Sequence, residues 1–103
     1  MTLRAALHEA AAELSEFDIV TGSDGSITWS RGGRPFAVLS PDGSAAEFGL
    51  DPAVAAAAAR TPDVAFSGRG SGWVRFRPAV LDDHGVDRAV AWLLSAHRRL
   101  AND

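Results

Sequence analysis

The apolar positions near the start of the chain recur at helical spacing. Leu3, Leu7, Ala10 and Leu14 follow one another at intervals of four, three and four residues. This spacing predicts a narrow apolar stripe on an amphipathic helix over residues 2–15.

From residue 17 to residue 50 the pattern changes to the alternation that is typical of strands. Gly32-Gly33 lies between two alternating segments and signals a tight hairpin, because glycine readily takes positive φ. The segment therefore predicts an antiparallel meander of three or four strands. We expect these strands at residues 17–20, 26–31, 35–39 and 45–50.

The second half of the chain adds helices and further strand signals. Asp51-Pro52 begins a short alanine-rich helix, which Pro62 ends. Residues 64–67 and 73–77 read as strands, and a helix follows from Asp82 or Asp83 to Leu100. The order predicts one α+β domain over residues 1–103. An antiparallel sheet of four to five strands would pack against the N-terminal and C-terminal helices, with a short middle helix beside it.

The last helix has a broad apolar face and a second stripe beside it. Its expected core face comprises Val86, Ala89, Val90, Leu93, Leu94, His97 and Leu100. Trp92 lies about 130° from the centre of that face, at 100° per residue. We therefore expect Trp92 to be exposed. With Arg88 and Arg99 it would form an interface between two copies of the chain, or alternatively recognise a ligand.

Composition narrows the class of protein. The chain has no cysteine, which excludes disulfides and thiolate metal sites. No signal peptide and no membrane-spanning run is evident, so we expect a soluble cytoplasmic protein without membrane contact. All ten basic residues are arginine, which is typical of the GC-rich coding of some bacteria.

The charge is unevenly distributed. The net charge is −3, which argues against a general nucleic-acid binder. Residues 1–30 carry a net charge of −4, residues 31–77 a net charge of +2 and residues 78–103 a net charge of −1. The positive middle third favours an anionic partner.

The strand at 73–77 is the sharpest candidate for a binding surface. Trp73, Arg75 and Arg77 share one face, while Val74 and Phe76 face the core. Trp73 would stack on a base or ring, and the arginines would contact an anion such as nucleic acid. The edge of this face is expected to hold Arg31, Arg34 and Arg69. The alternative is that Trp73 packs under a helix while the arginines pair with acids such as Glu47, Asp82 or Asp83.

Catalytic and metal-binding motifs are weak. The turn Gly68–Gly72 leads into a strand and lacks a following Gly-Lys-Ser/Thr, which favours a β-turn over a phosphate loop. His97 is expected to be a buried, hydrogen-bonded core residue. Asp82-Asp83-His84 is more typical of a helix cap than of a metal site. We therefore predict no catalytic residue, no cofactor and no enzymatic activity.

Two family resemblances rest on short motifs. The strand Arg34-Pro35-Phe36-Ala37-Val38-Leu39, the Asp-capped helix, the later Gly72-Trp73-Val74 and a final helix with Ala96 make residues 30–100 resemble small bacterial MmcQ/YjbR-like domains. The run from Ser71 to Phe76 also resembles bacterial domains named luciferase-like, which here implies no light-emitting chemistry. Both resemblances imply a compact α+β fold, and the first implies possible DNA binding.

Three hypotheses for function follow. The leading one is a small non-enzymatic binding module for an anionic partner such as nucleic acid. The alternative is a homodimeric structural or protein-interaction domain without catalytic activity. The third, an enzyme or small-molecule sensor, would require a closed apolar pocket lined by His97.

Overall fold

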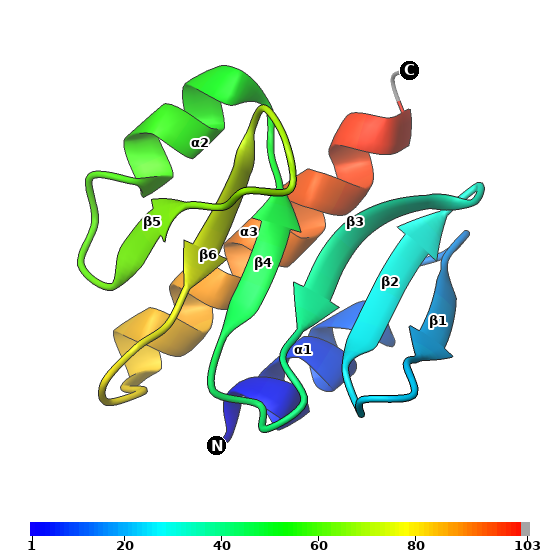
Figure 1. The fold of residues 1–103 in the computed structure, drawn as a ribbon, viewed down its shortest axis with the longest axis horizontal. Helices are drawn as coiled ribbons and strands as arrows, with labels where there is room; N and C mark the ends of the chain where they lie inside the picture. The colour runs from blue at the N-terminus through cyan, green and yellow to red at the C-terminus, as the bar shows by residue number, and fades with distance from the viewer. Residues whose placement is uncertain (102–103) are drawn as a thin grey trace.

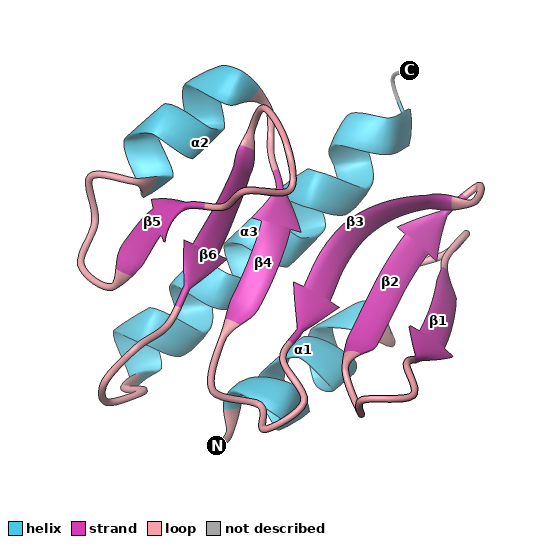
Figure 2. Cartoon of the chain, viewed as in Figure 1, coloured by secondary structure: helices cyan, strands magenta, loops and turns pink. Residues whose placement is uncertain are grey.

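A computed structural model describes residues 1–101, which form three helices and six strands (Figures 1 and 2). In chain order the elements are α1 (Leu3–Ala11), β1 (Asp18–Thr21), β2 (Ile27–Arg31), β3 (Arg34–Leu39), β4 (Ala46–Gly49), α2 (Pro52–Ala58), β5 (Val64–Phe66), β6 (Trp73–Phe76) and α3 (Asp83–Ala101). No helix in this described part is long and apolar enough to cross a membrane.

The strands form one antiparallel sheet in the order β1-β2-β3-β4-β6-β5. The predicted α+β class, the meander and the three helices are confirmed. The sheet has one strand more than the four to five expected, because the short strands at both edges, β1 and β5, pair fully with their neighbours. The crossover from β4 through α2 and β5 places β6 next to β4.

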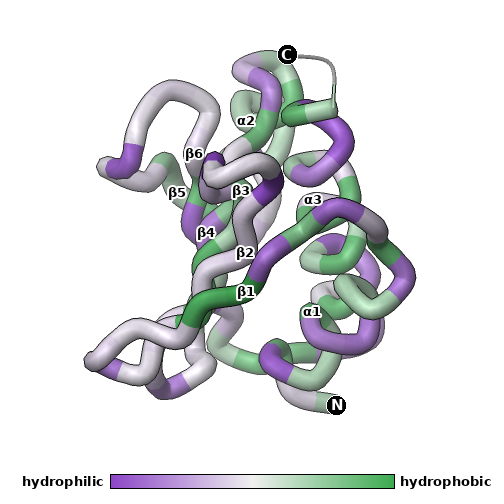
Figure 3. Tube along the Cα trace, turned by 90° about the vertical axis from the view of Figure 1, so that its right-hand side faces the viewer, coloured by the Kyte–Doolittle hydropathy of each residue, from purple (hydrophilic) through white to green (hydrophobic). Residues whose placement is uncertain are grey.

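The helices cover one face of the sheet. Figure 3 shows α1 and α3 on the same side of the strands, and α3 packs on β3 and β4. The opposite face carries no helix in the middle of the sheet (residues 1–101), and α2 lies near the β5–β6 end (Figure 1). That face is not uniformly open: Val38, opposite Glu47 in the register, is 6% exposed, whereas Arg75 is exposed.

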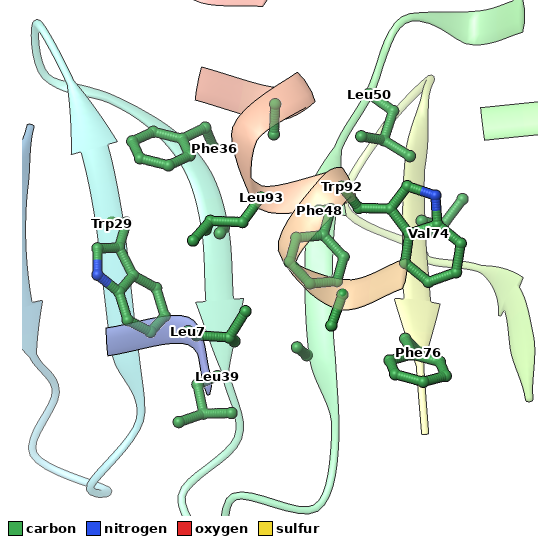
Figure 4. Packing of buried hydrophobic residues seen from close by; sticks show 14 of the residues in the cluster. Leu7, Trp29, Phe36, Leu39, Phe48, Leu50, Val74, Phe76, Trp92 and Leu93 are labelled. Atoms are coloured by element: carbon green, nitrogen blue, oxygen red, sulfur yellow. The ribbon is translucent and has the colours of Figure 1, made fainter. Parts of the chain in front are cut away.

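The core lies between α3, α1 and the inner face of the sheet (Figure 4). Val74 and Phe76 are fully buried, as their alternation with Trp73 and Arg75 predicted. Trp29 and Phe48 are also fully buried and come from β2 and β4. Each large aromatic ring removes roughly 150–250 Å² of surface from water, so these residues dominate the burial.

The first helix is shorter than predicted and uses a slightly different stripe. It spans Leu3–Ala11, and the Thr2 hydroxyl caps its start by accepting from the Ala5 amide at 3.0 Å. Leu3 and Leu7 are buried as expected. The predicted members Ala10 and Leu14 are only half-buried, and Leu14 lies beyond the end of the helix.

The predicted exposure of Trp92 is wrong. Its side chain is 8% exposed and packs against the rings of Phe48 and Phe76, with centroid distances of 6.1 and 5.4 Å. Figure 4 shows Trp92 and Leu93 both directed toward the sheet. The helix is rotated relative to the expected face, because its buried residues include Gly85, Ala89, Trp92, Leu93 and Ala96, while Val86 and Val90 are half-buried.

The hairpin turns follow the sequence signals. Gly32 and Gly33 have φ of 57° and 80°, which confirms the predicted tight turn between β2 and β3. Between β3 and β4, Asp42 Oδ1 accepts hydrogen bonds from the Ser44 amide at 3.0 Å, the Ser44 hydroxyl at 2.7 Å and the Ser40 hydroxyl at 2.9 Å. These donors favour the charged carboxylate and lower the pKa of Asp42 to about 2.

The turn at Asp42 predicts a pH-dependent contribution to stability. Because the pKa of Asp42 is lower in the folded state than its ordinary value of 3.8, the contribution is present above 3.8 and is lost as the pH falls through about 2. Asp42→Ala is therefore expected to destabilise the protein at neutral pH, with a difference from wild type that disappears in strong acid.

Urea unfolding across this pH range measures the difference. As a second check, Ser44→Ala removes one donor and is expected to raise the pKa of Asp42 in an NMR titration. A difference between Asp42→Ala and wild type that stays constant down to the acid limit would contradict the assignment.

Candidate functional site

Trp73 begins β6 directly opposite Gly49 of β4. A Cβ at Gly49 would lie 2.9 Å from both Cε2 and Cζ2 of the Trp73 indole. The indole therefore occupies the space in which any larger residue would place its side chain. Trp73 is half-buried as a result, with one side of its indole against the sheet.

Glu47 connects the loop before β6 to the sheet. Its Oε1 lies 3.1 Å from the Nε of Arg69, and its Oε2 accepts a hydrogen bond from the Ser67 hydroxyl. The Glu47 side chain is only 14% exposed, which strengthens these charge-assisted bonds relative to a surface pair. The Arg69 guanidinium carbon lies 5.9 Å from the centre of the Trp73 ring, so Glu47 also positions Arg69 beside the indole.

Gly72 fixes the other end of the same loop. Its φ is 82°, and a Cβ there would lie 2.1 Å from the Leu50 carbonyl oxygen. The Gly72 carbonyl in turn accepts a hydrogen bond from the Leu50 amide at 2.9 Å. A side chain cannot be accommodated at this close approach of two backbones. The glycines thus shape a turn that leads into a strand.

Three arginines and Trp73 line one hollow, which we call the Trp73 cleft. Its volume is about 530 Å³. The cleft lies where the β2–β3 hairpin, the β5–β6 loop and the end of α3 meet. Its lining residues are Gly33, Arg34, Pro35, Arg69, Gly70, Ser71, Trp73, Arg99 and Leu100. Arg34, Arg69 and Trp73, which the sequence assigned to one ligand surface, are therefore brought together.

Arg75 and Arg77 lie outside the Trp73 cleft. Both are exposed, and they line a separate hollow of about 290 Å³ together with Asp42 and Glu47. Arg75 is directly opposite Glu47 in the register of β6 and β4. The two carboxylates offset the charge of the two guanidiniums in this second hollow. The predicted surface is thus divided, and its more cationic part is the Trp73 cleft.

Arg31 forms a junction between β2, α3 and the segment after α1. Its Nη1 lies 3.2 Å from His97 Nδ1 and 3.1 Å from the His97 carbonyl oxygen, and its Nη2 lies 2.7 Å from Glu16 Oε2. The Arg31 side chain is only 18% exposed. These bonds hold its guanidinium against α3 and Glu16, and Arg31 lines an adjoining hollow with Arg34 and Leu100 instead of the Trp73 cleft itself.

His97 is the buried, hydrogen-bonded histidine that the sequence predicted. It is 7% exposed, and its Nε2 lies 2.7 Å from the Ser15 carbonyl oxygen. Since a carbonyl only accepts, Nε2 carries the proton and Nδ1 accepts from Arg31. The ring also meets the edge of Phe36 at a centroid distance of 5.3 Å. Every polar atom of the ring is thereby used in holding α3, β2 and the segment after α1 together.

The predicted stripe of Arg88, Trp92 and Arg99 does not form a single surface. The Arg88 guanidinium lies over the Phe76 and Trp92 rings, at 5.1 and 5.6 Å from their centres, and its Nη1 donates to the Pro62 carbonyl at 3.2 Å. Arg88 therefore attaches α3 to the segment after α2. Arg99 lies about three turns further along α3 and lines the Trp73 cleft. The predicted interface was based on an exposed Trp92, and Trp92 is buried.

Arg99 lines the Trp73 cleft, although the sequence analysis assigned it to the interface stripe and not to the ligand surface. Its position depends on the direction in which α3 crosses the sheet, which no local pattern reports. The only local signal for a cationic site at this end of the helix was the pair of basic residues in its last turn, Arg98 and Arg99. Among residues 1–101, no group of three His, Cys, Asp or Glu side chains is arranged to hold a metal ion.

Comparison of the chain with protein-family models, with curated proteins and with solved structures gave no match. The resemblances to MmcQ/YjbR-like and luciferase-like domains therefore stay predictions from short motifs. The Trp73 cleft is interpreted from its own geometry.

Gly49→Ala is expected to displace Trp73, because the new methyl group would lie 2.9 Å from two ring atoms. The overpacking should lower the free energy of unfolding by roughly 1–3 kcal/mol and increase the accessibility of the indole to acrylamide. Gly68→Ala is the matched control, since a Cβ at Gly68 has no atom within 4 Å. Equal quenching in both variants would show that the position of the Trp73 indole does not depend on the absence of a side chain at residue 49.

Proposed function

We propose that this protein is a non-enzymatic binding module whose Trp73 cleft takes an anionic partner, with single-stranded nucleic acid as the leading candidate. The supporting observation is that Arg34, Arg69 and Arg99 line one hollow with Trp73, although they come from three separate segments. Guanidinium groups are planar, permanently charged and suited to bidentate contact with phosphate.

The charge of the cleft supports an anion over a cation. Its described lining contains three arginines and no Asp or Glu. Glu47 compensates part of the Arg69 charge at 3.1 Å, but it does not line the cleft itself. A phosphate entering here would gain the attraction of several guanidiniums within a concave surface, where screening by solvent is weaker than on an open face.

The shape of the cleft supports a short, flexible ligand. A volume of about 530 Å³ falls in the range of small-ligand sites. One side of Trp73 rests against Gly49, and Arg69 lies near the ring, so the indole and the guanidinium together form a platform for a planar group. Bases of single strands stack on tryptophan and on arginine planes, whereas the bases of a duplex are not exposed in this way.

Binding should depend on the cleft arginines and on salt. Single-stranded DNA and RNA of about eight nucleotides provide suitable probes. We expect Arg34→Gln/Arg99→Gln to weaken binding about tenfold or more and to reduce the salt slope by roughly 1.4, since each lost contact to a single strand contributes about 0.7.

Arg75→Gln/Arg77→Gln is the matched control, because it removes the same charge from outside the cleft. Fluorescence anisotropy of labelled strands at several salt concentrations measures both effects. The proposal fails if neither strand binds at low salt, or if the two double variants weaken binding equally.

We infer a second candidate function, homodimerisation, from the edge strand β1. All four of its residues are exposed, and Ile19 and Val20 are 46% and 59% exposed. An edge strand offers unpaired backbone N–H and C=O groups to another strand. Figure 3 shows the hydrophobic stretch of β1, which is the terminal strand of the sheet.

A twofold axis perpendicular to the sheet would pair β1 with its own copy. Centred on Val20, it places the two Val20 side chains opposite each other and Ile19 opposite Thr21. Each Asp18 then lies away from the Asp18 of the other copy, so like charges do not meet across the pair.

Val20→Lys is expected to convert such a dimer to a monomer, because an inserted charge blocks edge-to-edge pairing. Light scattering over a range of protein concentrations measures the mass. Val54→Lys on α2 is the control, since Val54 is also an exposed valine but is far from β1 in the chain. A wild-type protein that is monomeric at every concentration would eliminate this candidate.

A further inference from the structure

A second hollow, apolar in character, lies between α1 and α3. Its volume is about 330 Å³. It is lined by Met1, Ala6, Glu9, Ala10, Glu13, Val86 and Val90. The two helices pack directly against each other, so the hollow is a groove along their shared side. We call it the α1–α3 groove, and it shares no lining residue with the Trp73 cleft.

The floor of the groove is apolar because of how α3 is rotated. Its helical spacing places Val86 and Val90 on an apolar face, yet both are only half-buried because Trp92 and Leu93 occupy the side toward the sheet. On α1, Ala10 is also half-buried and is too small to cover the valines. Further burial of these side chains would be favourable, at roughly 25 cal/mol per Å².

The rim of the groove is acidic. Glu9 lies in the last part of α1 and Glu13 in the turn that follows it; both are exposed and line the groove. The first thirty residues, which include α1, carry a net charge of −4. Met1, which is 72% exposed, also borders the groove. An occupant with basic groups beside its apolar groups would therefore be favoured over an anionic one.

From the apolar floor and the acidic rim we propose that the α1–α3 groove binds a basic amphipathic helix of a partner protein. A third helix laid along the groove between two packed helices satisfies ordinary ridge-into-groove packing. The volume of about 330 Å³ lies at the lower end of ligand sites, which suits a few anchoring side chains of a peptide. The anchors would be apolar residues at helical spacing, with Lys or Arg facing Glu9 and Glu13.

The probe is a labelled peptide of about 14 residues with leucines at helical i, i+3, i+4 and i+7 spacing and lysines elsewhere. Matched peptides carry glutamine or glutamate in place of lysine. Amide NMR spectra of the full chain should show shifts concentrated at Ala6, Ala10, Val86 and Val90 with the lysine peptide. The glutamine peptide should bind more weakly, and the glutamate peptide should not bind.

Two double variants test the rim. Glu9→Gln/Glu13→Gln should weaken the lysine peptide about fivefold or more at low salt, where surface charges are least screened. Asp18→Asn/Asp63→Asn removes the same charge elsewhere and should change the affinity less than about twofold. Ala10→Leu, which fills the groove without altering its charge, should also weaken binding.

Three results would overturn the proposal: amide shifts located outside the groove, equal affinity for the lysine and glutamine peptides, or equal effects of the two charge variants. The groove shares no lining residue with the Trp73 cleft, whose three arginines repel a lysine-rich peptide, so these outcomes are independent of whether that cleft binds an anion. Circular dichroism of each variant checks that the fold is retained.

Discussion

The packing of Trp92 between α3 and the sheet determines how the other surfaces of the molecule are arranged. Its ring contacts Phe48 and Phe76, and Leu93 beside it is fully buried. With these residues toward the strands, the rotation of α3 about its axis is fixed. The Arg88 guanidinium then lies over the rings of Phe76 and Trp92. The half-buried Val86 and Val90 of α3 lie on the side toward α1.

Two polar residues near the C-terminal end of α3, His97 and Arg99, have different surroundings. His97 meets Arg31 and the Ser15 carbonyl, which joins α3 to β2 and to the segment after α1. Arg99, two residues later, lines the Trp73 cleft. The Trp73 cleft is therefore lined by the ends of elements whose central residues form the core. Its geometry depends on how Trp92 and Leu93 pack α3 against the sheet.

Local signals in the sequence predicted local structure well. Strand alternation identified Val74 and Phe76 as core residues, and Gly32-Gly33 identified the hairpin. The prediction for Trp92 was wrong because the angle of 100° per residue was measured from a single assumed centre of the buried face. The helix α3 instead packs against both the sheet and α1, so its buried face is centred elsewhere. The division of the arginines among a cleft, a second hollow and a structural junction depends on contacts between distant segments, such as Arg31 with His97, which no local pattern encodes.

The position of α3 along the chain has a consequence for how the protein is made. All six strands within residues 1–101 precede α3, yet the inner face of their sheet is covered largely by that helix. The bonds from His97 to Arg31 and to Ser15 span 66 and 82 residues. During synthesis, the apolar face of the sheet must remain without its main cover until α3 has left the ribosome. That interval is when a nascent chain of this architecture is most exposed to aggregation and most dependent on chaperones.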